Sequence, residues 1–159
     1  MDTRRRGESV TSYASRLTRD YLGAIPPDFY RSYSSVLKVE GLLGLFTRRK
    51  IEQGTIIGEY IGRVISVKQS DTDPEIDARY LFHVNRRGRD DIVIDAGDPC
   101  TSAFTRYVNA TFSDEQQNTA FFQWSERIFL KATRDIPANT ELLTWYGDDT
   151  EDIVNWKPH

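Results

Sequence analysis

Short runs of apolar residues, many of them β-branched or aromatic, recur along most of this chain between glycine, proline and polar turns. Runs of this kind at a spacing of roughly eight to twelve residues are typical of β-rich domains, because each strand needs only one buried face. The pattern by itself predicts a mainly β domain, built as a small sandwich or barrel. The runs that predict strands are residues 36–39, 55–67, 80–84, 92–94, 120–124, 127–133 and 142–146.

The beginning of the chain has a different period. Tyr13, Leu17 and Tyr21 recur at every fourth position, which predicts the apolar stripe of a helix. Pro26 and Pro27 would end that helix, because proline lacks the backbone N–H that the helix needs. A second short helix is predicted within residues 99–107, and polar loops within 68–77 and 109–118.

Composition narrows the class of protein. The chain has 159 residues, 38% of them apolar, which suits one globular domain. No apolar run approaches the roughly 18 residues that a membrane-spanning helix needs. The N-terminus is rich in arginine and has no apolar stretch, so it is not expected to be a secretory signal. Cys100 is the only cysteine, so we expect an intracellular protein with neither an internal disulfide nor a clustered-cysteine metal site.

Charge is distributed unevenly. The net charge of −3 argues against direct nucleic-acid binding, which usually requires a basic face. Arginines crowd the first twenty residues, whereas acidic residues crowd 148–152. These are either plain solvated ends, or the acidic end helps to attract a basic peptide by long-range steering.

Two motifs carry the strongest functional signal. R-Y-V-N at 106–109 is followed by the acidic stretch D-E-Q-Q-N at 114–118, and then by E-L-L-T-W-Y-G at 141–147. This ordered set resembles the signature of SET-domain protein lysine methyltransferases, and is closest to the PR-domain branch of that superfamily. The resemblance covers residues 38–149.

The resemblance implies a fold and an activity. The fold would be a mainly β SET-type arrangement of several small sheets with few short helices. In it the C-terminal segment would be threaded under an earlier loop, as a pseudoknot. We accordingly divide the chain into an N-terminal extension (1–36), a catalytic core (37–150) and a C-terminal flank (151–159). The activity would be methyl transfer from S-adenosyl-L-methionine to a lysine in a basic protein tail such as a histone, in the nucleus or on chromatin. The oligomeric state is left open.

The same resemblance assigns cofactor-binding residues. G-L-F at 44–46 matches the end of the family's glycine-rich turn, although the first glycine is either displaced by one position, to Gly41, or replaced by Leu42. Ala110 replaces the family's usual histidine, and Trp156 is either a hydrophobic clamp or a lid over the site. The residues expected to contact the cofactor are Gly44, Leu45, Phe46, Arg106, Tyr107, Asn109, Ala110 and Trp156.

Two tyrosines are the expected catalytic residues. Tyr60 and Tyr146 match the phenols that wall the family's lysine channel, and Leu130 and Thr150 stand where relatives often carry further tyrosines. Because a desolvated amine beside a sulfonium loses its proton readily, no general base is needed. The alternative is a PR-like interaction module with little or no catalysis. Ala110, Thr150 and the altered glycine spacing favour it.

Overall fold

The structure is a computed structural model that describes residues 3–34, 36–37 and 39–145. The described part is mainly β, with short helices, as predicted. Its elements are α1 (Val10–Asp20), β1 (Phe29–Tyr33), β2 (Leu43–Thr47), β3 (Ile56–Glu59), β4 (Arg63–Ser66), α2 (Val67–Thr72), η1 (Ala78–Tyr80), β5 (Leu81–Val84), β6 (Ile92–Asp95), η2 (Phe104–Tyr107), β7 (Asn109–Thr111), β8 (Thr119–Trp124), β9 (Arg127–Ala132), β10 (Thr140–Glu141) and β11 (Leu143–Trp145).

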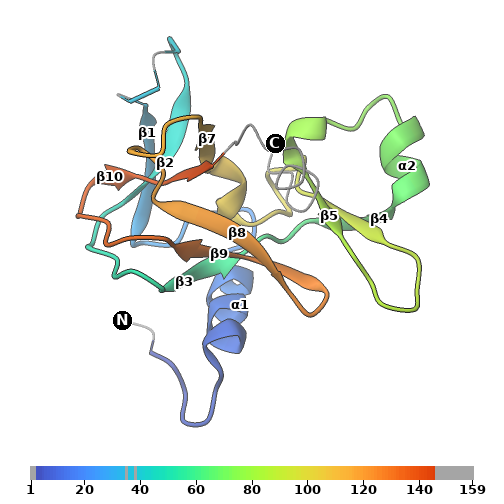
Figure 1. Cartoon of the computed structure of the whole chain (residues 1–159), viewed down its shortest axis with the longest axis horizontal. Helices are drawn as coiled ribbons and strands as arrows, with labels where there is room; N and C mark the ends of the chain where they lie inside the picture. Colours follow the sequence, from blue (N-terminus) through green and yellow to red (C-terminus); the bar gives the residue numbers. More distant parts are fainter. Residues whose placement is uncertain (1–2, 35, 38, 146–159) are drawn as a thin grey trace.

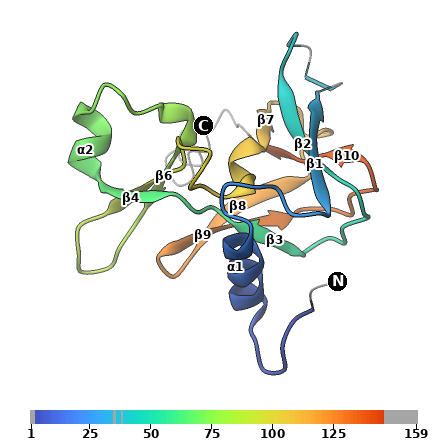
Figure 2. The same ribbon diagram turned by 180° about the vertical axis from the view of Figure 1, so that it is seen from behind.

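The strands form three small sheets, with the orders β1-β2-β10, β3-β9-β8-β11-β7 and β4-β6-β5. Figures 1 and 2 show the third sheet and α2 standing to one side of the other two sheets. The two C-terminal strands connect the first two sheets. β10 pairs with β2, and β11 inserts between β7 and β8, parallel to both. The end of the described chain therefore lies directly alongside β7, some thirty residues earlier in the sequence.

Four of the predicted strands pair as two hairpins. β8 and β9 pair along their whole length around a turn in which Ser125 has a positive φ of 56°. β5 and β6 pair antiparallel, and Gly88 in their turn has a φ of 71°, a conformation that glycine adopts without strain. The predicted run 55–67 divides into β3 and β4 around Gly62. A Cβ at Gly62 would lie 2.3 Å from the carbonyl oxygen of Asp95, so the close approach of these two segments requires glycine.

Four local predictions were wrong. Residues 36, 37 and 39 belong to the connection between β1 and β2, and the strand lies earlier, at Phe29–Tyr33, inside the range we assign to the N-terminal extension. The predicted helix within 99–107 is a single 3₁₀ turn, the predicted loop 68–77 begins with helix α2, and the predicted loop 109–118 contains β7. For β1 and β7, pairing with a distant segment decided the outcome, and local composition does not report such pairing.

Helix α1 is confirmed, but it faces the core with other residues than predicted. Tyr13, Leu17 and Tyr21 are only half-buried, whereas Ala14, Ser15 and Thr18 are buried. Ser15 Oγ donates to Glu59 Oε1 at 2.6 Å, and Thr18 Oγ1 accepts from the backbone N–H of Glu59 at 3.0 Å. Small hydroxyl side chains let the helix approach β3 closely and satisfy its polar groups.

The hydrophobic core lies between the sheets. Tyr60, Phe82 and Phe121 form a triangle with ring centroids 5.4–5.5 Å apart. Leu130 and Phe104 are fully buried in the same cluster. Burial of side chains of this size contributes roughly 1.5–3 kcal/mol each.

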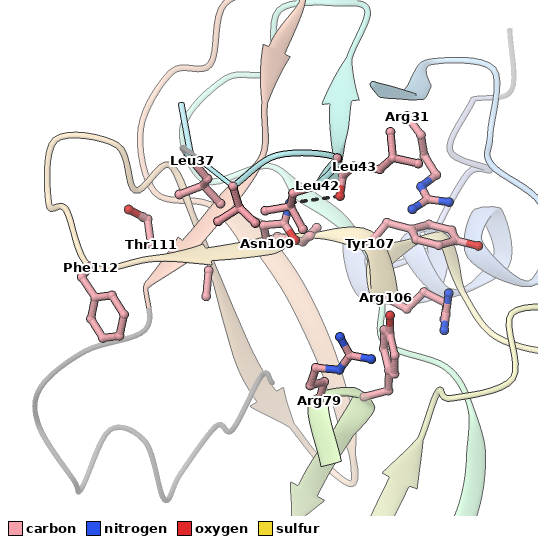
Figure 3. A pocket seen from close by; sticks show the side chains of 15 residues that line it. Arg31, Leu37, Leu42, Leu43, Arg79, Arg106, Tyr107, Asn109, Thr111 and Phe112 are labelled. Carbon is pink, nitrogen blue, oxygen red and sulfur yellow. Dashed lines mark hydrogen bonds between the residues drawn. The ribbon is translucent and has the colours of Figure 1, made fainter. Parts of the chain in front are cut away.

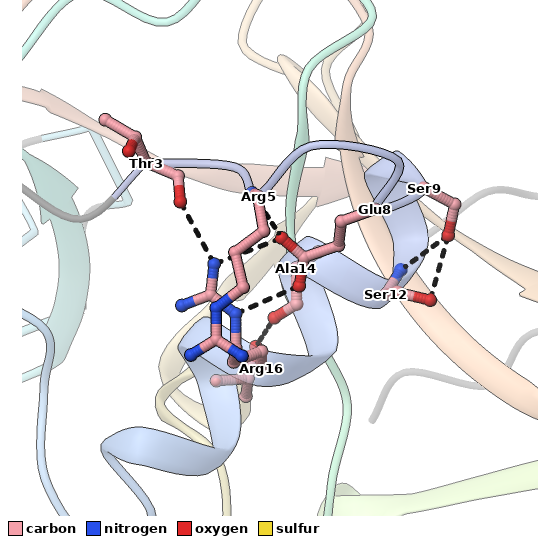
Figure 4. A network of polar contacts seen from close by, with 8 residues as sticks. Thr3, Arg5, Glu8, Ser9, Ser12, Ala14 and Arg16 are labelled. Atoms are coloured by element: carbon pink, nitrogen blue, oxygen red, sulfur yellow. Dashed lines mark hydrogen bonds and ion pairs between the residues drawn. The ribbon is translucent and has the colours of Figure 1, made fainter.

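Glu8 organises the segment that precedes α1 (Figure 4). Its carboxylate accepts from Arg16 Nε at 2.9 Å and from the backbone N–H of Arg5 at 2.9 Å. Hydrogen bonding to Arg16 and then to Arg5 lowers the pKa of Glu8 from 4.5 to about 2. A carboxyl with a lowered folded-state pKa stabilises the fold above its unfolded pKa, and this contribution is lost as the pH falls toward the folded pKa.

We therefore expect Glu8→Gln to lower the unfolding temperature at pH 7, and to lower it progressively less as the pH falls from 4.5 toward 2. Thermal unfolding followed by circular dichroism at several pH values measures this. The control is Glu52→Gln, because that exposed side chain makes no hydrogen bond or ion pair among the described residues. A loss at Glu8→Gln that is independent of pH would contradict the assignment.

Candidate functional site

A cleft of about 660 Å³ opens where the turn before β2 meets η2 and β7. Figure 3 shows its lining side chains, which differ in kind from one end to the other. One end carries Arg31, Arg106 and Tyr107, the middle carries Asn109, and the other end carries Leu37 and Phe112. The cleft therefore offers a cationic end, a polar centre and an apolar end to a single ligand.

The cationic end is a stack of guanidinium groups and phenol rings. Arg106 donates to the carbonyl oxygens of Ala96 and Gly97 at 2.7 and 3.1 Å, and its guanidinium lies 4.1 Å from the ring centroid of Tyr80. The guanidinium of Arg31 lies 4.1 Å from the ring centroid of Tyr107. Neither arginine pairs with a carboxylate among the described residues. Rings and carbonyls orient these groups without cancelling their charge, so this end favours an anion.

The polar centre is fixed by the side chain of Asn109. Its Nδ2 donates to the carbonyl oxygen of Leu43 and to Glu141 Oε2, both at 3.1 Å. Because both partners are acceptors, the amide orientation is determined, and both N–H groups are used. The side-chain oxygen has no donor among the described residues, so it remains to accept a hydrogen bond from a ligand.

Gly44 makes this arrangement possible. A Cβ at Gly44 would lie 2.1 Å from Glu141 Oε2 and 3.1 Å from Asn109 Nδ2. The carboxylate of Glu141 occupies that space, and its other oxygen accepts from Ser34 Oγ at 2.6 Å. The absence of a side chain at position 44 is therefore required by Glu141.

The structure brings together four of the residues predicted to bind the cofactor, namely Arg106, Tyr107, Asn109 and Ala110. At the glycine turn it is Gly41, Leu42 and Leu43 that line the cleft, while Leu45 and Phe46 are buried behind it. Direct contact of residues 44–46 with a cofactor stays a prediction.

Of the predicted channel residues, Tyr60 and Leu130 lie in the core. The hydroxyl of Tyr60 donates to the carbonyl oxygen of Tyr80 at 2.8 Å, and burial raises the pKa of this phenol. Leu130 is fully buried in β9. Tyr146, Thr150 and Trp156 lie outside the described residues. The channel roles of Tyr60, Leu130, Tyr146 and Thr150 stay predictions, as does contact of Trp156 with the cofactor.

Sequence reasoning missed Arg31 and the apolar end of the cleft. Arg31 reaches the cleft because β1 pairs with β2, and Phe112 because β7 ends beside β11. No local signal distinguishes these residues from ordinary surface side chains. Among the described residues there is no group of three potential metal ligands, and no helix there is long and apolar enough to cross a bilayer.

Gly44→Ala tests the packing of the cleft. The added methyl would displace the Glu141 carboxylate and the Asn109 amide, so we expect the free energy of unfolding to fall by about 2 kcal/mol. Urea denaturation measures this free energy of unfolding. Gly88→Ala is the matched control, because nothing lies within 4 Å of its Cβ and only its positive φ opposes the change, at a cost of roughly 1 kcal/mol. An equal or smaller loss at Gly44 would contradict the close packing.

Comparison with known proteins agrees with the motifs. The chain is 31% identical over 106 residues to PRDM6 of Homo sapiens, and this alignment covers 66% of this chain and 18% of that protein. It is 33% identical over 121 residues to histone-lysine N-methyltransferase set-17 of Caenorhabditis elegans, and this alignment covers 76% of this chain and 42% of that protein. The chain thus spans less than half the length of these relatives.

Solved structures share the fold. The methyltransferase domain of human PR domain-containing protein 2 superposes with a TM-score of 0.62 at 24% identity, over 84% of this chain and 86% of that one. ATXR5 in complex with histone H3.1 mono-methylated on R26 superposes with a TM-score of 0.61 at 20% identity, over 77% and 58% of the two chains. These likenesses confirm the SET-type fold class.

The sequence model of the PR domain of PR domain zinc finger protein 2 matches residues 32–156. This match covers most of the chain and contains R-Y-V-N, β11 and the residues that line the cleft except Arg31. The chain belongs to the PR-domain family, a branch of the SET-domain superfamily.

Proposed function

We propose that this protein is an S-adenosylmethionine-dependent protein lysine N-methyltransferase that acts on a basic protein tail such as that of a histone. The observation that carries the proposal is the cleft. Two arginines without acidic partners among the described residues lie at one end of it, next to a single amide oxygen that is free to accept a hydrogen bond. That combination is complementary to the carboxylate and ammonium groups of an amino acid.

The chemistry of the cleft fits the cofactor along its whole length. Arg31 and Arg106 would hold the carboxylate, and the side-chain oxygen of Asn109 would accept from the ammonium. Leu37, Val39 and Phe112 would cover the adenine, an aromatic group of suitable size. The volume of about 660 Å³ lies in the usual range for a small-molecule site.

When bound, S-adenosylmethionine supplies an electrophilic methyl group on a cationic sulfonium. The protein then has to hold a neutral lysine amine in line with that methyl group. Free lysine has a pKa near 10.4, and desolvation beside a positive charge lowers it. The sequence motif assigns alignment of the amine to Tyr146, with Tyr60 in the channel wall.

The substrate and its location follow from the relatives. Set-17 is named as a histone-lysine N-methyltransferase, and ATXR5 was solved with a histone H3.1 peptide. A lysine in a histone-type tail is thus the substrate we infer, and the nucleus or chromatin is the location. No direct contact with nucleic acid is part of the proposal.

A PR-like interaction module is the second candidate, and a specific observation favours it. The hydroxyl of Tyr60 donates its only proton to the carbonyl oxygen of Tyr80, and Leu130 is fully buried in the core. A channel formed by these side chains would present fewer phenol groups to an amine. Such a module would keep the cleft and lose the transfer reaction.

Calorimetry with S-adenosylmethionine tests the cofactor site. We expect binding by the unaltered protein and about tenfold weaker binding by Arg31→Ala, because a charge-assisted hydrogen bond is lost. Arg87→Ala is the charge-matched control, since this exposed arginine does not line the cleft. Absence of binding to the unaltered protein would exclude the proposed function.

Methyl transfer to core histones and to an array of histone lysine peptides separates the two candidates. We expect transfer by the unaltered protein, and loss of most transfer in Tyr146→Phe with nearly unchanged cofactor affinity, because the phenol acts on the amine. Cofactor binding without transfer to any peptide would favour the interaction module. Loss of cofactor affinity in Tyr146→Phe would show that this tyrosine contacts the cofactor instead.

A further inference from the structure

Glu141 is a buried carboxylate without a basic partner. It lies in β10, its side chain is buried, and the residue is 3% exposed. Among the described residues no lysine, arginine or histidine forms an ion pair with it. Burial of a carboxylate is costly unless hydrogen bonds compensate, so the bonds that it accepts identify what it holds in place.

One oxygen of Glu141 holds the polar centre of the cleft. Oε2 accepts one of the two N–H groups of Asn109, at 3.1 Å, and the carbonyl oxygen of Leu43 accepts the other. If the carboxylate were absent, the Asn109 amide would lose one of the two partners that determine its orientation. Rotation by half a turn would then present N–H groups to the cleft in place of the oxygen.

The other oxygen of Glu141 holds one wall of the cleft. Oε1 accepts from Ser34 Oγ at 2.6 Å, and that hydroxyl in turn accepts from the backbone N–H of Leu37 at 3.0 Å. The backbone N–H of Ser34 also donates to the carbonyl oxygen of Leu42 at 2.9 Å. Leu37 and Leu42 both line the cleft, so Glu141 connects the Asn109 amide to the facing wall.

We propose that Glu141 is a positioning residue that holds the Asn109 oxygen toward the cleft and so confers recognition of a ligand's amino group. The inference rests on the proposed function, because the amino group is that of S-adenosylmethionine. Glu141 itself does not line the cleft, and it acts through Asn109.

Three substitutions separate this role from simple support of the fold. Glu141→Leu removes both acceptors at similar volume. Glu141→Asp keeps the charge but is one methylene shorter, so it cannot reach both Ser34 and Asn109. Glu141→Gln restores the arrangement, because its oxygen can accept from Asn109 while its amide group donates to Ser34 Oγ.

The experiment compares two ligands by calorimetry. S-adenosylhomocysteine carries the amino acid group, whereas 5′-methylthioadenosine has the same nucleoside and thioether without it. We expect Glu141→Leu and Glu141→Asp to weaken binding of S-adenosylhomocysteine about tenfold more than binding of 5′-methylthioadenosine, because both ligands meet the wall that Ser34 and Leu37 form but only the first carries the amino group. Glu141→Gln should bind both ligands within about threefold of the unaltered protein.

Two outcomes would overturn the inference. One is unchanged binding of S-adenosylhomocysteine by Glu141→Asp and Glu141→Leu. The other is parallel loss of both ligands, which would show that Glu141 only maintains the shape of the cleft. If Glu141→Leu does not fold, Glu141→Asp and Glu141→Gln carry the comparison. Absence of binding of either ligand to the unaltered protein would instead refute the proposed function.

Discussion

The hydrogen bonds of the Glu141 carboxylate join segments that lie far apart in the sequence. Ser34 follows β1, Asn109 begins β7, and Glu141 ends β10. Their meeting point is the backbone of Gly44, where any side chain would take the place of the carboxylate. Asn118 adds bonds to the backbone of Glu141 and Leu143, both at 2.8 Å. A buried carboxylate tolerates little displacement before it loses a partner, so the Glu141 side chain restricts how these segments can move relative to one another.

The cleft shows how a polar site can be built on an apolar core. Leu45, Phe104 and the rings around Tyr60 belong to the buried core, from which water is excluded. The arginines of the cationic end are exposed or half-buried. The guanidinium groups are oriented by phenol rings and backbone carbonyls, and not by carboxylates. They therefore keep both their geometry and their charge, which is what recognition of an anionic group requires.

Much of the fold could be predicted from sequence where the signal is local. The β8–β9 and β5–β6 hairpins follow from alternating residues around a turn, and helix α1 from its four-residue period. The errors fall where pairing is long-range. β1 was missed because its aromatic residues follow a proline pair, and only the complementary edge of β2 makes them a strand. The buried face of α1 was misjudged because it docks through Ser15 and Thr18.

The candidate site divides in the same way. The motifs by themselves indicated the family and the mainly β fold class, and they predicted that Arg106, Tyr107, Asn109 and Ala110 belong to one site, because a motif keeps its residues together along the chain. Only the tertiary structure decided that Arg31, Leu37 and Phe112 share a cleft with them. It also decided that Gly44 leaves the space that the Glu141 carboxylate occupies. These relations depend on strands that pair across the sequence, as β11 does with β7, and neighbouring residues carry no record of such pairing.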